Sequence, residues 1–196
     1  IHICRDGRDV ARSTILMGWA GNMFTGVKYW ITEELLWQKL SPQLAPEQKL
    51  TVHYEALIKN PDEVLTQICH FIGVPFDRAM YNYPQHSAYS LPDPQFTEQW
   101  RRKLSNYEIQ LVESRISTML EERGYQLSGL PVLKITPWLR WRMLMSDRWG
   151  RQLFNLRRYG FGLYLQDVLA RRLLPFKGWR KRVQLKTNAI DNKHLK

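Results

Sequence analysis

The chain has 196 residues, of which 44% are hydrophobic and 12% aromatic, so it can bury the core of one globular domain with room for an appendage. No apolar run approaches the ~20 residues that a membrane-spanning helix needs, and no Asn-x-Ser/Thr glycosylation site occurs. Its two cysteines, Cys4 and Cys69, fall in an expected strand and an expected helix, where buried free thiols are favoured over a disulfide. We expect a cytoplasmic protein.

The net charge of +11 is unevenly distributed along the chain. Residues 1–130 carry 13 Lys and Arg and 15 Asp and Glu, whereas residues 131–196 carry 16 Lys and Arg and only three acidic residues. This change in charge predicts a slightly acidic domain over 1–130 and a basic helical extension over 131–196. We expect that the extension can be removed without loss of a ligand site in the domain.

The first residues predict a strand that runs into an arginine-rich turn. Ile1, Ile3 and Cys4 are apolar, Arg5-Asp-Gly-Arg follows, and a mostly helical stretch reaches Leu40, with glycines as breaks. Such a strand–turn–helix unit places a ligand at the carboxyl edge of a parallel sheet. Because arginine and a helix N-terminus both favour anions, the sequence predicts a phosphate site near the arginines and Ser13. The alternative is a solvated turn in which the arginines pair with neighbouring acids.

A second strand is predicted over residues 50–54, ending at Tyr54. If the two strands are parallel neighbours, Tyr54 and Arg5 lie at one sheet edge, an arrangement that suits a nucleotide. A half-buried strand tyrosine is the alternative. We interpret Glu55 as a structural acid, and His53 as a strand residue; His86 is a weak candidate for contact with an acceptor.

Helix signals follow each strand. Asn60-Pro-Asp-Glu63 resembles a capped start of a helix that ends at Gly73, and Ser105 and Glu108 form a capping box for a helix closed by Gly124. Residues 77–100 have the composition of loops. The alternation of strands and helices predicts an α/β fold with a short parallel sheet.

At this point the residues resemble a known family. Arg5-Asp-Gly-Arg-Asp-Val-Ala-Arg-Ser13 is similar to the 3′-phosphate-binding segment of sulfotransferases that use 3′-phosphoadenosine-5′-phosphosulfate, nearest to their bacterial and tyrosylprotein branch. Val52-His-Tyr-Glu-Ala-Leu57 and Cys69-His-Phe-Ile-Gly-Val-Pro75 resemble two later segments of that family, and Trp100-Arg-Arg-Lys-Leu-Ser105 is a weaker match.

The resemblance implies the C-terminal part of a P-loop-type three-layer fold. It implies that Arg5 and Ser13 hold the 3′-phosphate, with Ser13 starting the helix, and that Tyr54 contacts the adenine. It also implies a hydroxyl or amine acceptor and no metal cofactor. In this family the phosphosulfate loop and catalytic base lie upstream of the strand that carries the arginine. We therefore expect a fragment that is cut at its N-terminal side and is catalytically silent.

The basic extension predicts helices over 138–158 and Leu163–Leu174, with Gly160 and Pro175 as breaks. Apolar residues recur every three or four positions in the first of these helices, and arginines lie mostly off that line. Three interpretations stay open: the tryptophans pack on the domain, the helix adsorbs to an anionic membrane, or it recognises an acidic acceptor or nucleic acid.

Two functional classes therefore remain. The first is a sulfotransferase whose acceptor is a carbohydrate, a peptide tyrosine or a small molecule. The second is a basic protein that binds nucleic acid or an anionic membrane. The net charge of the first 130 residues disfavours nucleic acid as the main partner.

Overall fold

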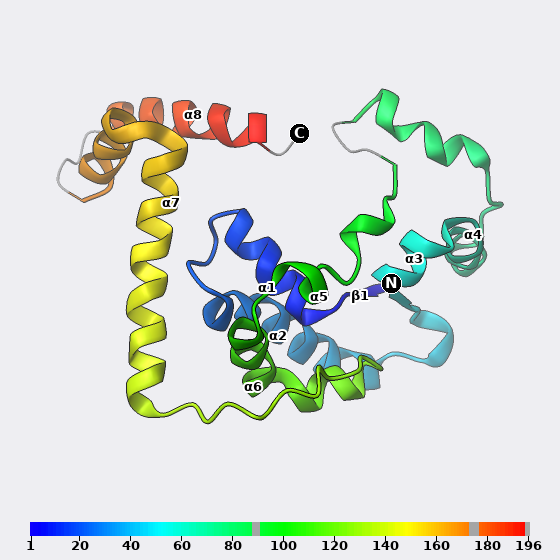
Figure 1. The fold of residues 1–196 in the computed structure, drawn as a ribbon. Coiled ribbons are helices and arrows are strands. Elements are labelled where there is room, and N and C mark those ends of the chain that lie inside the picture. The colour runs from blue at the N-terminus through cyan, green and yellow to red at the C-terminus, as the bar shows by residue number, and fades with distance from the viewer. Residues whose placement is uncertain (88–90, 173–176, 195–196) are drawn as a thin grey trace.

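The computed structural model describes residues 1–87, 91–172 and 177–194. The secondary structure elements are, in chain order, β1 (His2–Cys4), α1 (Gly7–Leu16), α2 (Met23–Leu40), η1 (Ser41–Gln43), η2 (Pro46–Gln48), β2 (Thr51–His53), α3 (Tyr54–Lys59), α4 (Pro61–Ile72), η3 (Arg78–Gln85), η4 (Pro94–Phe96), α5 (Gln99–Lys103), α6 (Asn106–Glu122), α7 (Pro137–Arg172) and α8 (Lys177–His194), where η marks a 3₁₀-helix. The chain is thus mostly helical around a very short sheet (Figure 1).

The sheet consists of β1 and β2 in parallel, and its register pairs Cys4 with His53. The expectation of an α/β fold with a short parallel sheet is confirmed to this extent. Because the paired residues are the last of their strands, the chain leaves the sheet side by side at Arg5 and Tyr54. Parallel strands need a long connection, and α1 and α2 supply it here.

The main hydrophobic core is formed by one face each of α1, α2 and α6. Its buried members are Ala11, Met23, Val27, Trp30, Val112, Ile116 and Leu120. The Trp30 indole also donates to the backbone carbonyl of Arg5 at 2.8 Å, which fixes the end of β1 against α2. The core thus determines the position of Arg5 at the end of the first strand.

Most expected helix ends are where the sequence placed them. Ser105 and Glu108 form the capping box of α6, and Gly73 ends α4 with φ of +77°, a conformation that favours glycine. The helical stretch up to Leu40 is interrupted after α1, and Asn22 caps α2 by accepting from the Thr25 N–H. The capping role expected of Asn60 is wrong, because its side chain makes no capping hydrogen bond.

In the described parts of residues 77–100, the loop-like stretch contains two 3₁₀-helices, η3 and η4. Residues 88–90 lie outside the described part of the chain, as do Leu174 and Pro175 at the end of the expected tail helix.

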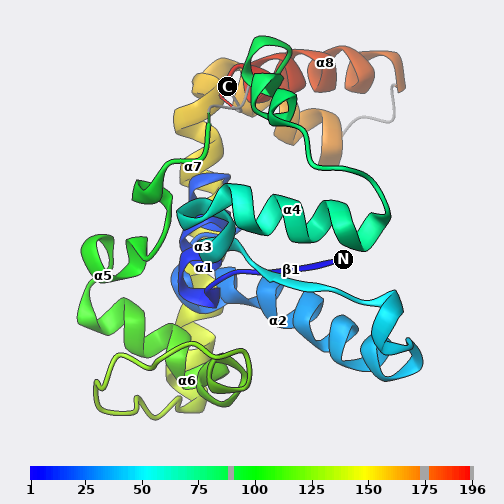
Figure 2. The same ribbon diagram turned by 90° about the vertical axis from the view of Figure 1, so that its right-hand side faces the viewer.

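The expected helix over 138–158 forms the first part of α7, which runs along one side of the body (Figure 1, Figure 2). Met143 packs with Phe24 and Leu111 in a second core cluster. Asp147 accepts hydrogen bonds from the Gly21 N–H and the Thr25 hydroxyl, both at 2.7 Å. This helix is therefore docked by apolar and polar contacts together.

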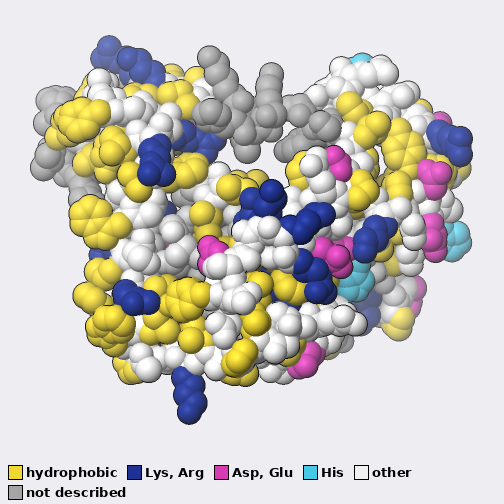
Figure 3. Space-filling view, viewed as in Figure 1, with side chains coloured by type: hydrophobic (Ala, Val, Ile, Leu, Met, Phe, Trp, Pro, Cys, Tyr) yellow, Lys and Arg dark blue, Asp and Glu magenta, His cyan; other side chains and the backbone are white. Residues whose placement is uncertain are grey.

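The tryptophans of α7 do not make this contact, so of the three open interpretations, the one in which they pack on the domain is wrong. Trp138, Trp141 and Trp149 are 63%, 58% and 76% exposed. Hydrophobic side chains accordingly gather along the α7 edge of the molecule, with Lys and Arg among them (Figure 3). The helical axis bends at Gly160, whose φ of +72° lies outside the helical region. None of the described helices is long and apolar enough to cross a membrane.

The docking of α7 depends on a close approach of two glycines, which yields a test. A Cβ on Gly150 would lie 2.6 Å from the carbonyl oxygen of Gly21 and 2.7 Å from its Cα. We expect Gly150→Ala to lower the free energy of unfolding by about 1–3 kcal/mol through overpacking, as measured by urea denaturation. The matched control is Gly162→Ala on the same element, which has open space around it and should be neutral or stabilising. Equal effects of the two substitutions would contradict this docking.

Candidate functional site

Arg5 and Tyr54 come together at the carboxyl edge of the sheet, as the sequence predicts. The Arg5 guanidinium carbon lies 4.3 Å from the centroid of the Tyr54 ring. One terminal nitrogen of Arg5 donates to the Phe96 carbonyl at 2.9 Å, but its buried Nε has no partner. A buried, unpartnered donor on a cation is a feature that an anionic ligand would satisfy.

Glu55 braces this edge, which confirms its interpretation as a structural acid. One of its carboxylate oxygens accepts from the backbone N–H of Asp6 at 3.1 Å, and the other accepts from the Tyr125 hydroxyl at 2.9 Å. The turn after β1 is thus tied to the start of α3, which positions Arg5 and Tyr54 relative to each other. His53 is held nearby, 3.3 Å from the same Tyr125 hydroxyl.

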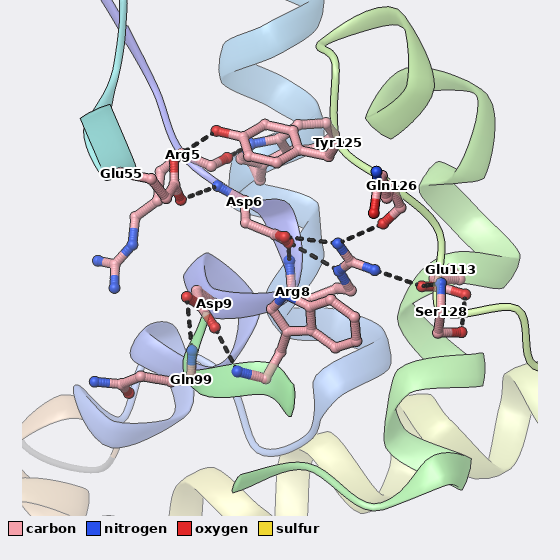
Figure 4. A network of polar contacts seen from close by, with 12 residues as sticks. Arg5, Asp6, Arg8, Asp9, Glu55, Gln99, Glu113, Tyr125, Gln126 and Ser128 are labelled. Atoms are coloured by element: carbon pink, nitrogen blue, oxygen red, sulfur yellow. Dashed lines mark hydrogen bonds and ion pairs between the residues drawn. The ribbon is translucent and has the colours of Figure 1, made fainter. Parts of the chain in front are cut away.

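Arg8 does not join Arg5 at a ligand site. Its side chain is 1% exposed and pairs with both carboxylate oxygens of Asp6, with Glu113 at 2.7 Å and with the Gln126 carbonyl at 2.9 Å. Its guanidinium also stacks 3.5 Å from the Trp100 ring. Figure 4 shows the Arg5 guanidinium pointing away from this network. Arg8 therefore connects α1 to α6 rather than binding a ligand.

The N-terminus of α1 is not the expected anion site. Asp6 caps this helix, and its carboxylate accepts from the Arg8 N–H at 2.9 Å, so an acidic group already occupies the position. Asp9 adds a second negative charge in the first turn. Because α1 begins at Gly7, Ser13 lies well inside the helix, and the expectation that it starts the helix is wrong.

Arg5, Ser13 and Tyr54 instead line one cavity of about 780 Å³ that runs along the side of α1. Asp9, Arg12, Ser13 and Leu16 face it at the three- and four-residue spacing of one helix face. Its volume lies in the range of small-molecule sites. The three residues predicted from sequence are thus neighbours around a space that can hold a ligand.

The cavity has a far wall that could not be predicted from the sequence. It is formed by residues of α7 and α8, namely Phe154, Asn155, Arg158, Tyr159 and Asp191. Since these lie in the basic extension, removal of residues 131–196 would open the cavity. The expectation that the extension can be removed without loss at the site does not agree with this wall.

Charged groups of both signs face the cavity. Arg12 donates to the Gln99 side chain at 2.7 Å, and Arg158 lies 3.0 Å from Asp191, which also accepts from the Tyr159 hydroxyl. Burial, followed by the hydrogen bond to Asp191, raises the pKa of Tyr159 to about 12, so this phenol stays protonated. The cationic groups Arg5, Arg12 and Arg158 outnumber the two carboxylates Asp9 and Asp191.

The contacts of Asp9 indicate a structural role and not a role in proton transfer. Its two oxygens accept from the backbone N–H groups of Gln99 and Trp100 at 3.1 and 2.7 Å and thereby hold α5 against α1. Burial raises the pKa of Asp9, although these two N–H donors act in the opposite direction. His86, the weak acceptor-contact candidate, ends η3 and does not line this cavity.

Comparison with known proteins identifies the part of the chain that carries this edge. A model described as "Sulfotransferase family" matches residues 1–78, which span β1 to α4 and include Arg5, Ser13 and Tyr54. Searches of curated proteins and of solved structures found no significant match. Over residues 1–78, from β1 to just beyond α4, the chain is therefore similar to the sulfotransferase family.

Proposed function

We propose that the cavity binds the nucleotide end of 3′-phosphoadenosine-5′-phosphosulfate, as part of a sulfotransferase that acts on a hydroxyl or amine acceptor. The observation that carries the proposal is that Arg5, Ser13 and Tyr54 line one cavity and all lie within the family-matched segment. Arg5 and Ser13 would donate to the 3′-phosphate, and Tyr54 would contact the adenine.

The chemistry of the cavity supports this role. Charge-assisted hydrogen bonds to a phosphate contribute roughly 1.5–3 kcal/mol each. Sulfuryl transfer, like phosphoryl transfer, depends mainly on positioning and on stabilisation of charge. Binding energy gained at a remote 3′-phosphate can therefore align the reacting sulfuryl group.

We also propose that the 196-residue chain alone binds the nucleotide but does not transfer sulfuryl groups. Within the described cavity wall, Asp9 is occupied by two backbone donors and Tyr159 is a protonated donor to Asp191. Neither is arranged as a general base. We assign the base and the phosphosulfate-binding loop to sequence outside this cavity wall.

Isothermal titration calorimetry of the chain with adenosine 3′,5′-bisphosphate tests the binding claim. We expect saturable one-site binding that weakens as salt rises, because the contacts are ionic. A parallel assay with sulfur-labelled donor and a panel of phenols, sugars and amines should give no turnover. Absence of nucleotide binding would overturn the proposed site, and clear turnover would show that the catalytic base lies within this chain.

A further inference from the structure

The outer side of α7 carries a stripe of exposed aromatic residues that no contact in the described structure explains. We call Trp138, Trp141, Met145 and Trp149 the tryptophan stripe. Its three tryptophans are all more than half exposed. Large aromatic side chains left in water in one row are unusual for a protein surface and indicate an interaction site.

The stripe and the docking face lie on opposite sides of the same helix. Each residue of a helix advances about 100° around the axis, so side chains two positions apart point in directions that differ by roughly 200°. Trp141 stands two residues before Met143, and Trp149 stands two residues after Asp147, and both Met143 and Asp147 contact the body. The body therefore holds α7 with its tryptophans directed outward.

Positive charge surrounds the stripe, and negative charge is nearly absent from it. Between residues 137 and 158 there are six arginines and a single acidic residue, Asp147. Asp147 is buried on the docking face and pairs there with Arg151 at 2.8 Å. Arg142 and Arg148 flank the stripe and are exposed. The outward side of α7 is thus cationic and aromatic.

The segment after the Gly160 bend extends this surface. The Tyr164 hydroxyl donates to the Gln152 side chain at 2.7 Å, which holds the two parts of α7 together. Between them lies a hollow of about 320 Å³ whose wall includes Trp149, Arg148 and Val168. Phe161, at the bend, is 71% exposed. The wall combines apolar side chains with an arginine, a mixture that can take a lipid chain below an anionic headgroup.

We propose that the tryptophan stripe and its flanking arginines form a docking surface for an anionic membrane. Tryptophan favours the membrane–water interface, where its ring reaches the acyl boundary and its N–H stays near the headgroups. Arginines beside such a stripe are attracted to anionic lipids. Nucleic acid would use the same charge, but three outward tryptophans on a continuous helix suit a planar lipid surface better. The proposal does not depend on nucleotide binding.

Vesicle co-sedimentation of the full 196-residue chain tests this surface. We expect binding to vesicles of phosphatidylcholine and phosphatidylserine in equal amounts, little binding to phosphatidylcholine alone, and release by salt. Tryptophan emission should shift to shorter wavelength on binding. The triple variant Trp138→Ala, Trp141→Ala, Trp149→Ala should have an affinity for the anionic vesicles that is lower by about tenfold or more. Its melting temperature should be unchanged.

Two sets of controls separate this surface from general stickiness. Leu36→Ala with Leu40→Ala removes exposed apolar residues from α2 and should leave vesicle binding unchanged. Arg142→Glu with Arg148→Glu should reduce vesicle binding by about tenfold or more, whereas Lys39→Glu with Lys103→Glu, exposed on α2 and α5, should have a small effect.

Three results would overturn the proposal. The first is no binding of the chain to the anionic vesicles, including the case in which it binds a duplex oligonucleotide instead. The second is undiminished vesicle binding by the folded triple tryptophan variant. The third is a dimer in solution that the triple variant converts to a monomer, because a second copy would then cover the stripe.

Discussion

Replacement of Arg8 by methionine is expected to lower the free energy of unfolding by about 3–5 kcal/mol, because it leaves buried carboxylates without their cation. Asp6 and Glu113 both pair with Arg8 at 2.7 Å, and all three side chains are largely shielded from water. The same guanidinium closes the contact between α1 and the chain after α6 through the Gln126 carbonyl. Chemical denaturation with urea measures the change.

The matched control is Arg78→Met, which removes a solvent-exposed ion pair. Arg78 and Asp62 lie 3.8 Å apart and their side chains are 85% and 59% exposed, so the expected loss is below about 1 kcal/mol. Arg8→Met should also shift urea midpoints without changing the slope of the transition. A loss for Arg8→Met no larger than that of the control would show that the network contributes little to stability.

The sheet edge could be predicted from sequence because local signals determine it. Two short apolar runs that alternate with helical stretches predict parallel strands, and the pairing of Cys4 with His53 then places Arg5 beside Tyr54. The capping box of Ser105 and Glu108 and the helix end at Gly73 are likewise encoded within a few residues. For such features the local pattern and the tertiary structure agree.

The role of Arg8 could be predicted only in part. Its pairing with Asp6 is the local alternative that the sequence offered, but its other partners are distant in sequence. Arg5, Arg8 and Arg12 lie within eight residues and look alike in sequence, yet Glu113 and Gln126, more than a hundred residues away, pair only with Arg8 among the three. The helix start at Ser13, which the resemblance implied, is wrong for a local reason, because Asp6 caps α1 and the helix already begins at Gly7.

The face of α7 that contacts the body could not be predicted from hydrophobicity alone. The tryptophans form the most hydrophobic face of this helix, but the residues that contact the body are Met143, Asp147 and Gly150. Two glycine backbones in close approach and a carboxylate bound to the Gly21 N–H make this contact, and neither produces a periodic apolar signal. Because the docking of α7 could not be predicted, the positions of Arg158 and Asp191 in the cavity wall could not be predicted either.

The second large effect is expected at Arg5, whose substitution tests the nucleotide site. We expect Arg5→Ala to weaken binding of adenosine 3′,5′-bisphosphate by about ten- to a hundredfold, since roughly 1.5–3 kcal/mol of charge-assisted hydrogen bonding is lost. Arg5→Lys should recover part of this loss, because it keeps the charge but not the planar fork. Lys103→Ala, a distant exposed cation, should leave the affinity unchanged. Melting temperatures of all three variants check that they are folded.

The most direct test of the central claim compares two ligands that differ only in the 3′-phosphate. Calorimetry of the unsubstituted chain and of Arg5→Ala with adenosine 3′,5′-bisphosphate and with adenosine 5′-monophosphate isolates the contribution of that group. We predict that the unsubstituted chain prefers the bisphosphate and that Arg5→Ala removes most of this preference while binding the monophosphate almost unchanged. An equal loss for both ligands, or a preference for the bisphosphate that survives in Arg5→Ala, would contradict the assignment of Arg5 to the 3′-phosphate.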